Sequence, residues 1–156
     1  MSRGRTAKAF LGLCALLIGN AARAESSPFV GRWHWNAAQS TLPPGAAGAD
    51  DVMADVNRLD GARVSWSFTV SSGQRAKRVE TFEAVADGEF HPINSDTMVA
   101  FHLMGNALQA TFKRPTGQTD SQTCTLSADQ QRMTCRGVLN SGDGGVTSYV
   151  DVYDRM

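Results

Sequence analysis

Histidine and cysteine are the residue types in this sequence best suited to metal binding or catalysis. The three histidines are His34, His91 and His102, and none is spaced with another histidine, a cysteine or a carboxylate in a pattern typical of metal sites. His34 and His102 each alternate with large apolar residues, so in a strand they would point to solvent. We therefore expect no metal site and no catalytic histidine.

Other signatures of catalysis are also missing from the sequence. It contains no G-x-S-x-G nucleophile elbow and no glycine-rich phosphate loop. Several carboxylates cluster near an expected hairpin, namely Glu80, Glu83, Asp87 and Glu89. Carboxylates in such a place usually form a solvated edge. Nothing in the sequence therefore supports an enzyme or calls for a cofactor.

Cys124 and Cys135 have the spacing of a disulfide within one hairpin. If residues 128–131 form the turn, Cys124 opposes Cys135 and Leu126 opposes Met133. Opposed Cβ atoms in an antiparallel pair lie roughly 4.5–5.5 Å apart, which allows a disulfide after small adjustment. A metal or redox pair would instead need C-x-x-C spacing or nearby histidines. The spacing thus predicts a structural disulfide.

The first 24 residues have the parts of a secretory signal peptide. Three basic residues precede the apolar run 9–18, which is too short for a stable membrane anchor, and residues 22–24 form an A-x-A cleavage site. We expect a signal peptide over 1–24 and one mature domain over 25–156, periplasmic or secreted, with no integral membrane anchor after cleavage. A disulfide agrees with such an oxidising compartment.

Cleavage of the signal would leave a mildly acidic domain. The chain has 15 basic and 15 acidic residues, and the signal holds four of the basic ones and no acid, so 11 basic residues remain against 15 acidic and the net charge is −4. Scattered charges in this balance form no basic patch for nucleic acid or an anionic membrane. Neither is an expected partner.

The mature sequence reads as short strands separated by turns. In residues 63–70, every second residue is apolar, which is typical of a strand buried on one face. Residues 99–103 and 108–112 alternate similarly, and 146–153 is rich in β-branched and aromatic residues. Glycine-containing turns separate these runs. About 8–10 strands of this kind predict an all-β, antiparallel sandwich or barrel.

An ordered set of residues across the mature chain carries a family resemblance. The set comprises Phe29, Gly31, Trp33, Asn36, Ser40, the pair Pro43 and Pro44, the run 126–129 and the closing run 152–155 (V-Y-D-R). It resembles small exported bacterial lipocalin-like proteins, which share the G-x-W start of the lipocalins. The resemblance implies an up-and-down β-barrel in which Trp33 follows Gly31, plugs one end and is covered by Arg155. The glycine usual in the last hairpin is replaced here by Gln130.

The first functional hypothesis follows from this barrel. A barrel of about eight strands either fills with side chains or holds one small ligand. Candidate ligand contacts are the large aromatics expected to point inward, namely Trp35, Trp66, Phe68, Phe101 and Phe112. For any single one of them, a place in the core is the favoured interpretation, so the functional hypothesis depends on the barrel as a whole. The sequence thus favours a non-catalytic periplasmic protein that encloses a small hydrophobic molecule.

The second hypothesis is a protein-binding module. Small exported barrels with one disulfide also resemble bacterial inhibitors of proteases and lysozymes, which engage a protein partner through loops or a terminus. The candidate contact regions here are the loop 42–49, the loop 141–145 and the N-terminal tail. A carrier needs a cavity among the inward aromatics, whereas an inhibitor needs a filled barrel and an ordered, protruding loop.

Overall fold

The computed structural model describes residues 26–43, 48–73 and 75–156, so the expected signal peptide lies outside the described residues. Ten strands make up this part of the chain: β1 (Gly31–Trp35), β2 (Asp51–Leu59), β3 (Arg63–Ser72), β4 (Arg75–Val85), β5 (His91–Pro92), β6 (Met98–Met104), β7 (Ala107–Lys113), β8 (Thr119–Leu126), β9 (Arg132–Asn140) and β10 (Val146–Arg155). Over the same residues there is no helix with the length and apolar character needed to cross a bilayer.

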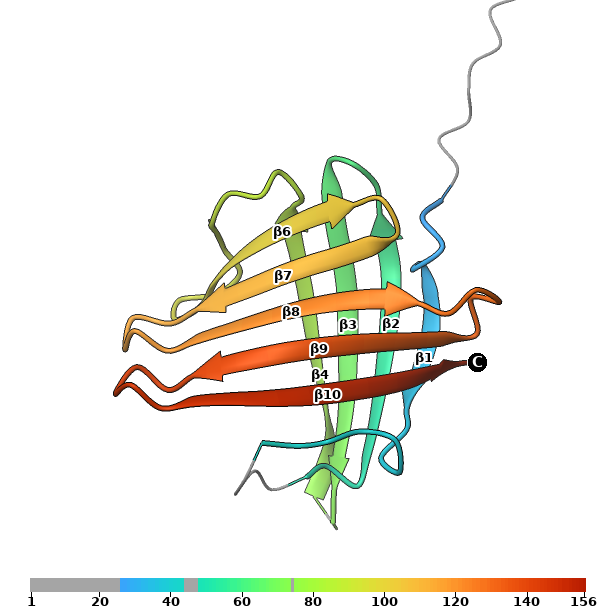
Figure 1. Cartoon of the computed structure of the whole chain (residues 1–156), viewed down its shortest axis with the longest axis horizontal. Helices are drawn as coiled ribbons and strands as arrows, with labels where there is room; N and C mark the ends of the chain where they lie inside the picture. The colour runs from blue at the N-terminus through green and yellow to red at the C-terminus, as the bar shows by residue number, and fades with distance from the viewer. Residues whose placement is uncertain (1–25, 44–47, 74) are drawn as a thin grey trace, which may run out of the picture.

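The strands form one antiparallel sheet that curls into a nearly closed barrel. Its order is β4-β3-β2-β1-β10-β9-β8-β7-β6-β5, so chain neighbours pair and the first strand pairs with the last. Figure 1 shows β2–β4 crossing behind β6–β10 at a steep angle, which gives the barrel two layers. β4 has no hydrogen-bonded ladder with β5 or β6, and this leaves one gap in the wall. The predicted all-β antiparallel barrel is confirmed.

Trp33 plugs one end of the barrel. Its side chain is fully buried, and its indole Nε1–H donates to the carbonyl oxygen of Phe29 at 2.9 Å. The guanidinium of Arg155 lies 4.1 Å from the centre of the indole ring. Arg155 also donates to the carbonyl oxygens of Pro28, Val30 and Gln130. Gly31 leaves room for this arginine, because a Cβ there would lie 2.5 Å from Arg155 Nη1.

The hairpin of β8 and β9 has the predicted register. Cys124 pairs with Cys135 and Leu126 with Met133, and the two cysteines form a disulfide that faces the barrel interior. Gln130 closes the turn with a φ of 58°, in the left-handed region that glycine adopts most easily. The predicted disulfide is therefore confirmed, and Gln130 takes a positive φ at the position where the resemblance to lipocalin-like proteins implies a glycine.

An aromatic cluster centred on Trp66 packs the two layers together. The ring of Trp66 on β3 meets Phe101 on β6 edge to face, with ring centres 4.8 Å apart. Phe82 on β4 and Phe112 on β7 complete the contact, with centres 6.4 and 6.3 Å from the Trp66 ring. Such aromatic pairs add about 0.5–1.5 kcal/mol each beyond the area they bury. Side chains thus connect the layers beside the gap where backbone hydrogen bonds are missing.

Candidate ligand-binding cavity

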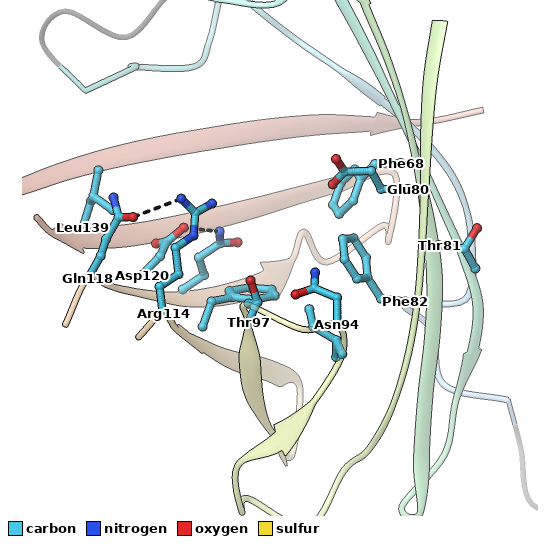
Figure 2. Close-up of a pocket in the computed structure, with 13 residues that line it drawn as sticks. Phe68, Glu80, Thr81, Phe82, Asn94, Thr97, Arg114, Gln118, Asp120 and Leu139 are labelled. Carbon is cyan, nitrogen blue, oxygen red and sulfur yellow. Dashed lines mark hydrogen bonds between the residues drawn. The ribbon is translucent and has the colours of Figure 1, made fainter. Parts of the chain in front are cut away.

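A large cavity opens between the two layers, beside the gap in the wall. Its volume is about 600 Å³, within the usual range for small-molecule sites. Its apolar lining comes from both layers and consists of Phe68, Phe82, Ile93, Phe112 and Leu139. Its polar lining consists of Glu80, Thr81, Asn94, Thr97, Arg114, Gln118, Asp120 and Gln122. We call this space the outer cavity (Figure 2).

Asp120 organises the polar wall of the outer cavity. One carboxylate oxygen accepts the hydroxyl proton of Tyr149 at 2.7 Å, and the other accepts from the side-chain amide of Gln122 at 3.1 Å. Burial and the adjacent Asp120 raise the pKa of Tyr149 well above its ordinary value, so the phenol stays protonated and keeps donating. The network therefore holds Gln122 in a defined position at the base of the cavity.

A glycine makes this network possible. Gly137 on β9 pairs with Tyr149 on β10, and a Cβ at Gly137 would lie 2.1 Å from the tyrosine ring. The hydroxyl end of the tyrosine ring therefore packs over Gly137 on β9, and its hydroxyl reaches Asp120 on β8. At the rim, Arg114 donates to the side-chain oxygen of Gln118 at 3.1 Å.

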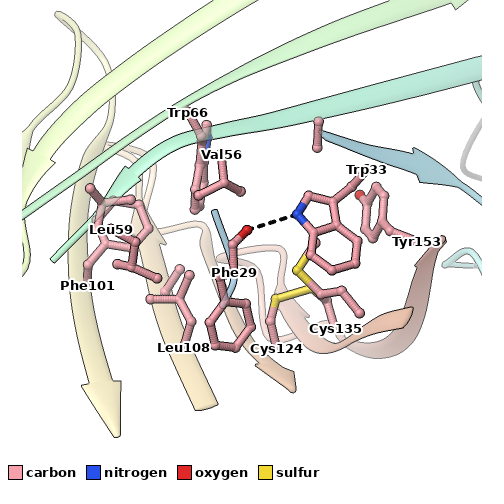
Figure 3. Packing of buried hydrophobic residues seen from close by; sticks show 14 of the residues in the cluster. Phe29, Trp33, Val56, Leu59, Trp66, Phe101, Leu108, Cys124, Cys135 and Tyr153 are labelled. Atoms are coloured by element: carbon pink, nitrogen blue, oxygen red, sulfur yellow. Dashed lines mark hydrogen bonds between the residues drawn. A yellow bond between two sulfur atoms is a disulfide. The ribbon is translucent and has the colours of Figure 1, made fainter. Parts of the chain in front are cut away.

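A second, smaller cavity lies deeper in the barrel. It measures about 40 Å³ and is lined almost wholly by apolar side chains and the disulfide, including Val56, Trp66 and Leu108. Phe68 and Gln122 line both cavities and so stand between them. We call this space the inner cavity; Figure 3 shows Trp66 and Val56 facing Phe29 and the disulfide across it.

The five predicted ligand contacts occupy different places. Phe68 and Phe112 line the outer cavity, and Trp66 with Phe68 lines the inner one. Phe101 is fully buried against Trp66 and lines neither cavity. Trp35 also lines neither, and its indole Nε1–H donates to Asp151 at 3.1 Å. The structure thus brings three of the five residues to the cavities.

No protein-family model matches the sequence, and no curated protein matches it. Solved structures do share its fold. The wild-type fluorescent protein UnaG matches with a TM-score of 0.56 at 17% identity, over 82% of this chain and 97% of that one. The zebrafish ileal bile acid-binding protein, solved with cholic acid, matches with a TM-score of 0.53 at 13% identity, over 83% and 100%. The chain shares the β-barrel fold of these two proteins, which agrees with the predicted barrel.

The polar residues of the outer cavity were missed by sequence reasoning, although a signal for two of them was present. Asp120 and Gln122 are spaced at intervals of two from Cys124, so the register that predicted the disulfide also turns them inward. Glu80 was expected at a solvated edge, but it pairs with Phe68 across β3 and β4 and lines the cavity. Glu83 does lie at an exposed edge, where it pairs with Arg63.

The histidines take no part in these cavities. His34 and His102 are exposed, as their alternation predicted, and His34 Nε2 lies 2.7 Å from an oxygen of Asp51. His91 lies 2.9 Å from Asp87 on the surface. Among the described residues, no group of three or more histidines, cysteines and carboxylates is placed to hold a metal ion.

Proposed function

We propose that this chain is a non-catalytic binding protein that holds one small, mainly hydrophobic molecule inside its barrel. The outer cavity is the observation that carries the proposal, because it offers about 600 Å³ between the two layers, lined by three phenylalanine side chains together with several polar groups. Apolar ligand surface buried there would contribute about 25 cal/mol per Å², before the cost of association. The polar groups around Asp120 would orient the ligand without chemistry. The match to a bile acid-binding protein supports such a role.

Export to the periplasm or the exterior is part of the proposal. The signal-like residues 1–24 support it, and so does the disulfide between Cys124 and Cys135, since disulfides persist mainly in oxidising compartments. The experiment below therefore uses the mature domain 25–156 recovered from a periplasm.

The cavity also favours this role over the protein-binding alternative. An inhibitor was expected to have a filled barrel, and the outer cavity does not meet that expectation. Of the expected contact loops, 42–49 includes residues 44–47, which lie outside the described part. The loop 141–145 is a compact turn closed by a hydrogen bond from Ser141 N to Gly145 O at 2.9 Å.

Native mass spectrometry on protein purified gently from the periplasm tests the proposal first. We expect a bound small molecule in near-stoichiometric amount, or uptake of one member of an added panel of lipids and tetrapyrroles. A clean ligand-free mass with no uptake from the panel would contradict the proposal and direct attention to the loops and a protein partner.

A pair of substitutions shows whether the bound molecule sits in the outer cavity. Leu139 lines it, whereas its neighbour Val138 points outward and is 45% exposed. Leu139→Trp should fill the space and weaken binding at least tenfold, while Val138→Trp should leave the affinity unchanged. Equal affinities for the two variants would show that the ligand binds elsewhere.

A further inference from the structure

We propose that Trp66 selects the ligand: the molecule held in the barrel carries a neutral hydrogen-bond acceptor oxygen on its leading end, and the indole N–H of Trp66 donates to it. The inference rests on the proposed function and names the ligand class more closely. The side chain of Trp66 is only 8% exposed, and its Nε1 atom is buried. This N–H nevertheless has no acceptor among the described residues.

The other two tryptophans show that this is a particular property of Trp66. Trp33 donates to the carbonyl oxygen of Phe29 at 2.9 Å, and Trp35 donates to Asp151 at 3.1 Å. Buried donors in folded proteins are nearly always paired, because an unmade hydrogen bond leaves the desolvated group uncompensated. The indole nitrogen carries a donor only, so its missing partner must be an acceptor.

Trp66 cannot readily turn to find an acceptor within the protein. Its ring is held edge to face by Phe101 at 4.8 Å between ring centres, by Phe68 at 5.7 Å and by Phe82 at 6.4 Å. Contacts of this kind from both layers fix the indole plane. An acceptor oxygen on a bound molecule would complete the hydrogen bonding of this N–H.

The inner cavity offers space for that acceptor beside the Trp66 side chain. Trp66 lines it, and only Phe68 and Gln122 line both it and the outer cavity. Its volume of about 40 Å³ suits one small polar group, since a water-sized group needs about 10–15 Å³ on this measure. The apolar body of the ligand would then rest in the outer cavity while its leading end passes between these two side chains.

The lining of the inner cavity also restricts the charge of that end. None of its lining residues carries a basic side chain, and most are apolar, such as Val56, Leu108 and Met133. An anion buried there would have no countercharge and would be strongly disfavoured. The geometry points to a neutral oxygen, such as that of a ketone, aldehyde, ester or amide.

Two probes of the same shape test the inference on the mature domain. They are 2-acetylnaphthalene, which has a carbonyl group, and 2-ethylnaphthalene, in which a methylene group replaces it. Calorimetry should show the acetyl probe binding about 3- to 10-fold more tightly, as one hydrogen bond to a buried donor predicts. The Trp66→Phe variant keeps an aromatic ring without the donor, and it should bind both probes equally.

Nuclear magnetic resonance gives a readout that does not depend on a variant. With ¹⁵N-labelled tryptophan, the indole N–H proton of Trp66 should move downfield when the acetyl probe binds. It should move much less with the ethyl probe, and the signals of Trp33 and Trp35 should stay near their positions because they already have acceptors.

The outcomes separate this inference from the proposed function. Equal affinities for the two probes, or an unmoved Trp66 signal, would overturn the selection by Trp66 and leave the binding protein intact. Persistent magnetisation transfer from bound water to the Trp66 N–H with the acetyl probe in place would also overturn it, since water would then be the partner. Failure of both probes, together with the panel above, would overturn the proposed function as well.

Discussion

Arg155 lies over Trp33, with its guanidinium 4.1 Å from the centre of the indole ring, and so joins the last strand of the barrel to the first. The same side chain donates to three backbone carbonyl oxygens, on Pro28, Val30 and Gln130. One residue thus covers the aromatic plug and ties down both the N-terminal segment and the β8–β9 turn. The barrel is closed at this end while its ligand-sized space opens elsewhere.

Arg155→Ala should loosen this closed end. Loss of the ring contact and of the hydrogen bonds to three carbonyl oxygens, of which that of Val30 is half-buried, should lower the free energy of unfolding by about 1–3 kcal/mol. The indole ring of Trp33 should become more exposed to water, so its fluorescence emission should shift to the red. Arg136→Ala, at an exposed position on the neighbouring strand, should change stability by no more than about 0.5 kcal/mol. An unshifted spectrum with unchanged stability would contradict the bracing role.

Gln130→Gly should stabilise the protein. Gln130 has a φ of 58°, which costs an ordinary residue about 1–2 kcal/mol and costs glycine almost nothing. Because glycine also gains freedom in the unfolded chain, the net rise in unfolding free energy should be about 0.5–1 kcal/mol. The backbone oxygen that accepts from Arg155 is kept.

The neighbouring position supplies the matched control for that turn. Gln131 is not among the described residues with positive φ, so Gln131→Gly relieves no strain there; it should lower stability, because it adds freedom to the unfolded chain and removes the hydrogen bond from the Gln131 side-chain amide to the Asp129 carbonyl oxygen. Urea unfolding of the two variants should therefore give changes of opposite sign. Changes of the same sign would show that backbone strain at Gln130 does not govern the stability of the turn.

Features set by local pattern could be predicted from the sequence. The alternation around Trp66 placed β3, and the spacing of Cys124 and Cys135 fixed the register of the β8–β9 hairpin. Both depend on the period of two residues that every strand obeys. The motif around Trp33 placed the plug at one end of the barrel.

The cavity could not be predicted, because it depends on how two layers cross. Sequence alternation says which side chains point inward but not how far apart the walls stand. Phe101 and Phe112 both point inward on neighbouring strands, yet one is sealed against Trp66 and the other lines open space. The gap beside β4 likewise arises from strand pairing over the whole sheet, which no short motif encodes.

Loss of the disulfide should destabilise the barrel modestly. Cys124 and Cys135 are 11 residues apart, so their bond restricts only a short loop in the unfolded chain. Replacing both with serine should cost about 2 kcal/mol, seen as a lower melting temperature. A reducing agent should lower the melting temperature of the wild type and leave the doubly substituted variant unaffected. An unchanged melting temperature in that variant would show that the bond contributes little to stability.

The contribution of Asp151 to the stability of the protein should increase on mild acidification. Burial is the main cause that raises the pKa of this carboxyl above 3.8, and the charge of Asp120 adds to it, while the hydrogen bond from Trp35 opposes both. A raised folded pKa means that the folded state binds the proton more tightly than the unfolded state. The contribution of Asp151 to stability therefore increases as the pH falls through its folded pKa toward 3.8 and levels off below.

Asp151→Asn and Asp154→Asn separate this effect from the general response to acid. Asp151→Asn keeps an oxygen for the Trp35 N–H and removes the buried charge, so it should raise stability at pH 7, with the gain shrinking as the pH falls. Hydrogen bonds from Asn36 and Arg132 lower the pKa of Asp154, so its stabilising contribution is present at pH 7 and fades as the pH drops below 3.8. Asp154→Asn should thus lower stability at pH 7. Denaturant unfolding at pH 7 and at pH 4.5 measures the stability changes of both variants. Lower stability of Asp151→Asn at pH 7 would contradict the prediction, because it would mean that neighbouring groups offset the cost of burying the Asp151 carboxylate.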